Sequence, residues 1–584
     1  MSRGKINSGL MVIALSTGVF GGRAEALPNG VASGEVTQDS ALIWSRRDTI
    51  GTLTLEVSSD LGFSTIVANS TTNVADPLLP VALPVTSLTP NTQYFYRATT
   101  PEGDSVTGQF RTAAALGART GVTFGVSGDW RGELLPYPGV SNVPGRNLDF
   151  FVALGDTIYA DFPSPAVPAA QATTLTEYRA KNAEVYSEKF GVNTLADLRA
   201  STPIWATIDD HEVTNDFAGG ADPATDSRFT FTTESFVNQT QLYKNGLQAF
   251  QEYNPIAPKV YSGTGDPRFD GAPNLYRSQS YGSDAAIFIP DARSFRDQEL
   301  PGANPNDPAS VFNFLVSAFN PTRTMLGGAQ LNQLKGDLLA AENAGVQWKF
   351  VMVPEPIQNL GVVGAGDRFE GYAAERSDLL RFIKTNDIDN VVFIAADIHG
   401  TIVNNLTYQD FPGGPQIPVK AWEITTGSLA FDEPFGPTVV QLAESLGVLP
   451  AGTFAFYNSL PAANKEAFIA NLINGQLNPL GYDPVGLQGS GVDFNLLAGG
   501  FTATNTFGWT EFDIDPSTGL LTVTTFGIDP YNESQINAGI LSRTPRIVSQ
   551  FQVQPEVPEP ASLSLMALAT LGLAARRRGR TLGT

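Results

Sequence analysis

A chain of 584 residues is too long for one ordinary domain, and its 42% apolar content supports large cores rather than disorder. The net charge of −22 argues against a surface built for nucleic acid, because phosphate backbones are neutralised by Lys and Arg. An anionic substrate must then be attracted locally, most simply by bound cations. The absence of cysteine excludes disulfides, thiolate metal ligands and a cysteine nucleophile.

The amino terminus has the three parts of a secretory signal peptide. Arg3 and Lys5 precede an apolar run over 10–20, and Ala24-Glu25-Ala26 offers a cleavage site. The pattern predicts a signal peptide over residues 1–26. The alternative is a buried N-terminal helix, but the order of charged start, short apolar run and small residues favours export.

Residues 28–112 have the pattern of an all-β domain. The segments 41–44 and 52–57 are short strands, and the second alternates with period two. A turn at Pro90 and Asn91 precedes an aromatic strand that contains Tyr94 and Tyr96. This pattern resembles fibronectin type III sandwiches, in which a tyrosine packs across the two sheets. We expect a β-sandwich with a structural role.

From about residue 120 the pattern changes to near-continuous apolar runs separated by helical stretches. Runs of this kind suit strands buried on both faces, and their alternation with helices predicts a layered α/β domain over 120–550. The poorly periodic interval 430–500 is interpreted as an insertion. A strand, a turn and a second strand over 509–526 return to the sheet. The predicted strands are 122–126, 150–154, 204–208, 350–353 and 391–395, and the predicted helices are 175–190, 329–344 and 372–385.

The carboxyl terminus also has the form of a sorting signal. Pro558-Glu559-Pro560 precedes an apolar stretch over 561–575 and three consecutive arginines at 576–578. That stretch is shorter than the ~20 residues that span a bilayer. The segment 555–580 resembles the PEP-CTERM signal of Gram-negative bacteria, which implies removal by an exosortase and no permanent membrane span in the mature form. A plain tail anchor is the alternative.

Acidic turns follow four of the predicted strands. Because ligands bind beyond the carboxyl ends of strands in open α/β sheets, we expect these turns to converge on one site. Both histidines of the chain, His211 and His399, lie in them. The candidate residues in these turns are Asp129, Asp156, Tyr159, Asp210, His211, Asn215, Asp397 and His399.

Carboxylates gathered this closely cannot all stay ionised unless cations lie among them. Oxygen and imidazole ligands suit Ca²⁺, Mn²⁺, Fe³⁺ or Zn²⁺, and a tyrosinate oxygen favours a trivalent ion. Two metals roughly 3.5–4 Å apart would polarise a phosphoryl oxygen and generate hydroxide for in-line attack. For Asp129 and Asp156 the structural alternatives are an ordinary turn and a helix cap.

Six ordered motifs resemble those of the PhoD-type alkaline phosphatases and phosphodiesterases, within the calcineurin-like superfamily of metallophosphoesterases. The resemblance covers roughly residues 28–425 and the strands near 505–528. Besides the opening segment 29–44, the motifs are Gly155-Asp156-x-x-Tyr159, Asp209-Asp210-His211-Glu212-x-x-Asn215, Asp291-x-Arg293-x-x-Arg296, Met325-Leu326-Gly327-x-x-Gln330, Glu370-Gly371-Tyr372-x-x-Glu375-Arg376 and Asp397-x-His399.

The resemblance implies a role for each candidate. Asp156 would bridge two metals, and Tyr159 would bind a ferric ion. His211 would lie beside the phosphate as proton donor or transition-state stabiliser. The second metal and the rest of the shell would be held by Asp210, Asn215, Asp397 and His399, and the substrate by Arg131, Arg293 or Arg296, for which ordinary ion pairing is the alternative.

One position departs from the family pattern. The family places a cysteine, an iron ligand, in the turn after the first of these strands, where this chain has Ser127-Gly128-Asp129. Asp129 could supply an oxygen ligand instead, or the site could be rebuilt for a different metal pair. Calcium is therefore favoured and Fe³⁺ is possible. The N-terminal region also lacks consecutive arginines, which favours unfolded export and metal loading outside the cytoplasm.

The function expected from this resemblance is exported, metal-dependent hydrolysis of small phosphate mono- or diesters, in the periplasm, on the outer surface or in the extracellular matrix of a Gram-negative bacterium. One alternative is a surface or matrix protein that kept the fold and lost turnover. A metal-dependent nuclease is the other, which the acidic composition disfavours.

Overall fold

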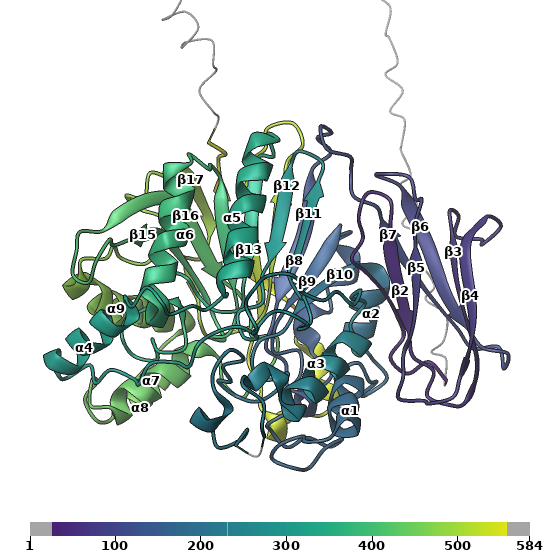
Figure 1. Cartoon of the computed structure of the whole chain (residues 1–584), viewed down its shortest axis with the longest axis horizontal. Helices are drawn as coiled ribbons and strands as arrows, with labels where there is room; N and C mark the ends of the chain where they lie inside the picture. Colours follow the sequence, from purple (N-terminus) through teal and green to yellow (C-terminus); the bar gives the residue numbers. More distant parts are fainter. Residues whose placement is uncertain (1–25, 231, 557–584) are drawn as a thin grey trace, which may run out of the picture.

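The computed structural model describes residues 26–230 and 232–556 (Figure 1). The predicted signal peptide before residue 26 and the predicted sorting segment after residue 556 lie outside these ranges. Among the helices within them, none is both long and apolar enough to cross a membrane.

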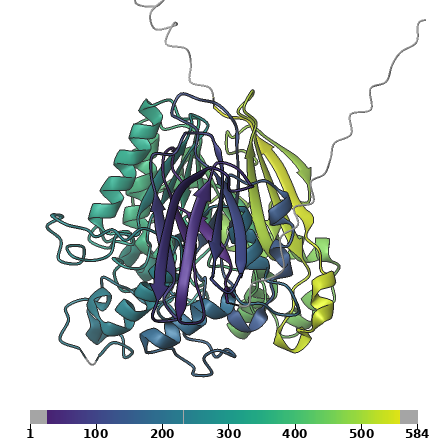
Figure 2. The same ribbon diagram turned by 90° about the vertical axis from the view of Figure 1, so that its right-hand side faces the viewer.

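The N-terminal region consists of antiparallel strands at one end of the molecule (Figures 1 and 2). Its four-stranded sheet has the order β4-β3-β6-β7, from Ile66–Val74, Gly51–Ser58, Gln93–Thr99 and Ser105–Arg111. Inward-facing Leu53, Leu55 and Val57 alternate with less buried residues, and they share a core with Tyr96 and Ile43. Three further strands face this sheet across the core: β1 (Val31–Gly34), β2 (Ala41–Ser45) and β5 (Val81–Val85).

These three strands also form the edge of a ten-stranded sheet that runs into the α/β region, because β1 pairs in parallel with β10 at Gly34 and Ile204. The order is β17-β21-β20-β19-β8-β9-β10-β1-β2-β5. The remaining strands are β8 (Val122–Ser127), β9 (Phe150–Leu154), β10 (Ile204–Thr207), β17 (Phe494–Ala498), β19 (Phe507–Ile514), β20 (Leu521–Ile528) and β21 (Arg546–Val553).

A seven-stranded sheet packs against this one. Its order is β11-β12-β13-β14-β16-β15-β18, from Arg277–Tyr281, Ala285–Ile289, Trp348–Met352, Val391–Ala395, Ile417–Thr425, Thr401–Tyr408 and Thr502–Ala503. Phe124 of β8 stacks on Phe150 of β9 at 4.7 Å between ring centroids and meets Phe350 of β13 edge-on at 4.9 Å. The strands β8, β9 and β10 are mutually parallel, as are β12, β13, β14 and β16. Buried on both faces, these strands have the apolar runs that the sequence shows.

Helices cover the outer faces of the two sheets. Those flanking the seven-stranded sheet are α5 (Gly328–Asn343) and α6 (Ala373–Thr385), which supply Leu334 and Leu379 to its outer core. On the other side lie α1 (Leu175–Val185), α2 (Thr194–Ser201) and α3 (Gln241–Tyr253). The helix α1 stops earlier than the predicted 190, because Lys189 and Val192 pair as an isolated bridge instead.

The interval 430–500, interpreted from sequence as an insertion, contains α7 (Phe435–Ser445), α8 (Thr453–Asn458) and α9 (Ala462–Leu477), beside α4 (Pro308–Ala318) in Figure 1. The described chain ends on a specific contact. The N–H of Glu556 donates to Asn390 Oδ1 at 2.6 Å, and its carbonyl accepts from Asn390 Nδ2 at 3.0 Å. Asn390 immediately precedes β14, so this end of the chain is held at the amino end of that strand.

Candidate active site

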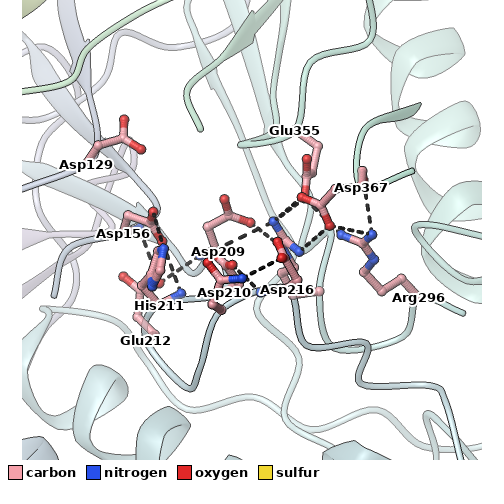
Figure 3. Close-up of polar contacts among 12 residues, drawn as sticks. Asp129, Asp156, Asp209, Asp210, His211, Glu212, Asp216, Arg296, Glu355 and Asp367 are labelled. Atoms are coloured by element: carbon pink, nitrogen blue, oxygen red, sulfur yellow. Dashed lines mark hydrogen bonds and ion pairs between the residues drawn. The ribbon is translucent and has the colours of Figure 1, made fainter. Parts of the chain in front are cut away.

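The predicted site residues lie where buried strands end. Asp129, Asp156 and Asp397 each follow the last residue of β8, β9 or β14 by two positions, and Asp210 follows β10 by three. The parallel strands β8, β9 and β10 bring three of these turns to one edge of the ten-stranded sheet, and β14 supplies the fourth from the facing sheet. Both sheets therefore contribute to one acidic region (Figure 3).

Four of these residues have a left-handed backbone. The φ angles are 61° at Asp129, 51° at Asp156, 60° at Asp397 and 59° at His399. This conformation is costly for residues other than glycine and persists where the surroundings impose it, commonly at functional sites. The turns thus hold their side chains in fixed directions.

The structure assembles two groups of candidate metal ligands that share one residue. Asp129, Asp156 and His399 bring ligand atoms within 4.8 Å of one another, and so do Asp156, Asp210 and His211. Asp156 therefore lies between the two groups, in the position expected of a carboxylate that bridges two cations.

The charge in this region fits bound cations. Both carboxylate oxygens of Asp129 are buried and find no hydrogen-bond partner in the described chain. Burial and the charges of Asp209 and Asp210 raise the pKa of Asp129 well above its usual value. Burial and the same two neighbours also raise the pKa of Asp156 well above its usual value. Buried carboxylates without partners are expensive, and cations would neutralise them, so this donor set fits a metal centre.

His399 and Tyr159 meet beside the first group. The Tyr159 hydroxyl lies 3.3 Å from His399 Nε2. Burial and the charge of His211 lower the pKa of His399 to about 3, so its imidazole is neutral and can offer a lone pair to a metal. Burial and the charge of Asp156 raise the pKa of Tyr159 well above its usual value, and a nearby cation would oppose that shift.

His211 is held by an aspartate that the sequence analysis missed. Its Nδ1 lies 2.6 Å from Asp161 Oδ1, and Asp161 Oδ2 accepts the N–H of Asn215 at 2.6 Å. The other ring nitrogen, Nε2, lies 3.9 Å from Asp156 Oδ2. Burial alone would lower the pKa of His211, but the charge of Asp210 and the hydrogen bond to Asp161 raise it to about 9. His211 therefore holds a proton beside the second group of candidate ligands.

A second missed residue, Glu212, ties two of the turns together. Its buried carboxylate accepts the N–H of Thr157 at 2.6 Å, the Thr157 hydroxyl at 2.7 Å and the N–H of Asp209 at 2.8 Å. The turn after β9 is thereby fixed to the turn after β10. Glu212 stands inside the motif quoted from the sequence, and its position next to His211 was the available signal.

Arg293 and Arg296, expected to bind substrate, instead lie in a closed network of ion pairs. Arg293 is fully buried and contacts Asp209 Oδ1 at 2.5 Å, Glu355 Oε1 at 2.5 Å and Asp367 Oδ1 at 2.9 Å. Arg296 is also fully buried, and pairs with Glu355 at 2.9 Å and Asp367 at 2.8 Å (Figure 3). These ion pairs agree with the alternative given for both arginines from the sequence, because carboxylates of the protein already contact the two guanidinium groups.

The other two predicted ligands are not among the three residues of the first group. Asp397 groups with Glu355 and Asp367, next to the arginine network, rather than with Asp129 and His399. Asn215 is exposed, and its side-chain amide donates to Asp216 Oδ2 at 2.5 Å.

Arg131 is the one predicted substrate arginine that lies outside this network. It is buried, its Nε donates to Glu133, and its guanidinium lies over the ring of Phe162 at 3.3 Å.

Comparison with known proteins agrees with this architecture. A model of the PhoD-like phosphatase family matches residues 129–447, and a model of that family's N-terminal domain matches residues 16–114. The PEP-CTERM protein-sorting motif matches residues 556–578, which indicates export and association with the cell surface. The chain is 28% identical over 441 residues to alkaline phosphatase D of Bacillus subtilis (strain 168), covering 68% of this chain and 69% of that protein.

A solved structure of PhoD shares the fold, with a TM-score of 0.65, 20% identity and 92% coverage of both chains. Since the matched catalytic-domain model alone spans more than half of the sequence, the chain belongs to the PhoD-like phosphatase family and is an exported phosphoric ester hydrolase.

Proposed function

We propose that this phosphatase holds two metal ions around Asp156 and uses His211 as proton donor to the leaving group. Asp129, Tyr159 and His399 would hold one ion with Asp156, and Asp210 and Asn215 would hold the other, with Asp397 supporting from the side of the arginine network. The observation that carries the proposal is the sharing of Asp156 by two ligand groups, one of which includes a buried carboxylate, Asp129, whose oxygens find no hydrogen-bond partner in the described chain.

Calcium suits this donor set better than iron. Four of the proposed ligands are carboxylates, one is an amide, and this chain has aspartate where the family commonly has cysteine. Hard oxygen ligands favour Ca²⁺, and Tyr159 keeps Fe³⁺ as the second candidate for the ion beside His399. When bound, the ions would polarise the phosphoryl oxygen and provide hydroxide at neutral pH.

The protein itself would supply orientation and a proton. Asp161 fixes His211 through Nδ1, so Nε2 is the nitrogen that faces the site and delivers the proton to the leaving oxygen. Arg131 would contribute positive charge beside the phosphate. The buried arginines Arg293 and Arg296 would act indirectly, because Arg293 fixes Asp209 next to the ligand Asp210.

The test is reversible loss of metal. Prolonged chelation should abolish hydrolysis of both p-nitrophenyl phosphate and bis-p-nitrophenyl phosphate, and added Ca²⁺ should restore most of it, with about two metal ions per chain by elemental analysis. The ratio of the two rates would reveal whether monoesters or diesters are preferred. Full activity in excess EDTA would overturn the metal mechanism. A metal-loaded protein inactive on both esters would favour a surface protein without turnover.

We further propose that an exosortase removes the PEP-CTERM segment after export across the inner membrane of a Gram-negative cell, following cleavage of the signal peptide over 1–26. The mature form would then act at the periplasm, the outer surface or the extracellular matrix on small phosphate esters. Intact mass of the protein recovered from an exosortase-containing host and from a strain lacking that enzyme would decide between removal and a retained tail anchor.

A further inference from the structure

A row of stacked rings and one guanidinium leads away from the proposed metal ligands. Phe431 stacks on His399 with ring centroids 3.7 Å apart and lies 5.3 Å from the ring of Tyr159. The guanidinium of Arg131 lies 5.5 Å from Phe431 on one side and 3.3 Å from Phe162 on the other. Phe162, Arg131, Phe431 and His399 therefore form one continuous series.

The backbone fixes both aromatic residues in place. The segment before Phe431 is hydrogen-bonded to the turn that carries Asp129: the N–H of Ala430 donates to the Asp129 carbonyl at 3.1 Å, and that of Arg131 to the Ala430 carbonyl at 3.0 Å. Phe162 follows Asp161, the partner of His211, and Lys181 donates to its carbonyl. Two loops that supply site residues thus also place the rings.

Exposure and unused donors indicate that this row is a binding surface. Phe162 is 41% exposed, although it adjoins a buried charged site where a polar residue would be better solvated. The terminal nitrogens of Arg131 make no hydrogen bond to any residue that the structure describes, since only Nε is engaged, with Glu133. A fixed guanidinium beside an exposed ring suits a ligand that is anionic at one end and aromatic at the other.

We propose that Arg131, Phe162 and Phe431 form the subsite for the alcohol portion of the phosphoester, and that it selects aromatic alcohols over small aliphatic ones. The inference rests on the proposed function, because that function places the phosphate beside Asp156 and His399. The free face of Phe162 would stack on the substrate ring, while Arg131 would hold a phosphate oxygen.

The experiment compares benzyl phosphate with propyl phosphate. Both release an alkoxide from a CH₂ group, so their difference reports on the ring rather than on the leaving group. Phe162→Ala should lower kcat/KM for benzyl phosphate about 3- to 10-fold more than for propyl phosphate, as expected for loss of one aromatic contact. Phe162→Tyr should retain the preference. Phe411→Ala is the matched control, because Phe411 is exposed and lies in the turn between β15 and β16, outside the segments that carry the site residues.

Binding provides a readout that does not need turnover. The dissociation constants of benzylphosphonate and propylphosphonate, measured by calorimetry, should differ in the wild type and converge in Phe162→Ala, with unchanged metal content. Phe431→Leu tests the second ring while it keeps a large apolar side chain beside His399, which Phe431→Ala would not. Equal losses for both esters, or an unchanged ratio of the phosphonate constants, would overturn the subsite. A wild type that hydrolyses neither of these esters nor bis-p-nitrophenyl phosphate would overturn the proposed function, and the phosphonate ratio would still decide on the subsite.

Discussion

Two buried acidic regions lie side by side at the ends of the strands, and they balance their charge differently. Around Arg293 and Arg296 the carboxylates have guanidinium partners: although burial opposes it, the two arginines hold the pKa of Asp367 below its usual value. Around Asp129 and Asp156 no such partner exists in the described chain, and burial raises both pKa values well above the usual range.

This difference suggests different roles for the two regions: the one around Arg293 and Arg296 supports the structure, and the one around Asp129 and Asp156 binds cations. Where the protein supplies its own cations, the acidic residues have ion-pair partners and can hold neighbouring turns in place. Around Asp129 and Asp156 the protein supplies only the imidazole of His211, 3.9 Å from Asp156, so the remaining charge is left for protons or for metal ions from outside. The arginine network and the ligand groups meet at Asp209 and Asp210, so one region orients the other.

The largest effect is expected from Asp156→Ala, which removes the carboxylate common to both ligand groups. Without it two cations would repel each other across an unfilled gap, so both metals and all measurable activity should be lost. Metal stoichiometry of the folded variant checks this. Asp378→Ala, which removes an exposed carboxylate paired with Lys335, is the matched control. If Asp156→Ala binds as many metal ions per chain as the wild type, Asp156 has only a structural role, and the two acidic regions do not differ in the way described above.

His211→Ala tests where the group of metal ligands ends. His211 lies beside Asp156 and Asp210, but its predicted role is that of a proton donor rather than a ligand. The variant should keep the metals and lower turnover about 10²–10⁴-fold, the range for a positioned proton donor. The loss should be smaller for esters with very good leaving groups, which need little protonation. Loss of a metal from this variant would show that His211 is itself a ligand.

Arg293→Met tests the support region by removing its central cation. Asp209, Glu355 and Asp367 would be left buried with fewer partners, and breaking a buried ion pair typically costs about 3–5 kcal/mol. The free energy of unfolding in urea should fall by that amount. A second substitution, Glu355→Gln, should recover part of the lost free energy of unfolding, because it removes one of the buried charges that Arg293 no longer neutralises. A stability equal to that of the wild type would contradict the interpretation of this region as a support.

Asp161→Asn should have the smallest effect, because Asp161 acts through His211. Turnover should fall about 10- to 100-fold, by analogy with residues that orient metal-site histidines, while metal content stays unchanged. The pH at which His211 loses its proton, followed by NMR, should fall as well, since a neutral amide replaces the carboxylate on Nδ1. A turnover loss without that shift would mean that Asp161 serves another role, such as holding the N–H of Asn215.

Sequence reasoning found the residues whose position relative to a strand carries information. The acidic turns after β8, β9, β10 and β14 could be located because apolar runs mark the strands and parallel strands end at one edge. Both histidines of the chain, His211 and His399, were found in this way.

The contacts that could not be predicted join segments with no common pattern. Asp161 meets His211 across 50 residues, and Phe431 reaches His399 from a segment that was interpreted only as the start of an insertion. Arg293 and Arg296 were recognised by motif, but their carboxylate partners Glu355 and Asp367 lie in loops where the sequence gives no sign of convergence. Unless those partners are known, the sequence does not distinguish an arginine in a buried ion pair from an arginine that binds substrate.

The contact between Glu556 and Asn390 places the start of the sorting motif relative to the acidic turns. The sorting motif begins at residue 556, and that residue is held at the amino end of β14, while Asp397 and His399 follow the carboxyl end. Five residues at ~3.3 Å each put roughly 16 Å of strand between the two ends. The start of the sorting motif and the turn that carries Asp397 and His399 therefore lie at opposite ends of one strand, so a tail would leave the described chain at the end of β14 remote from the catalytic edge.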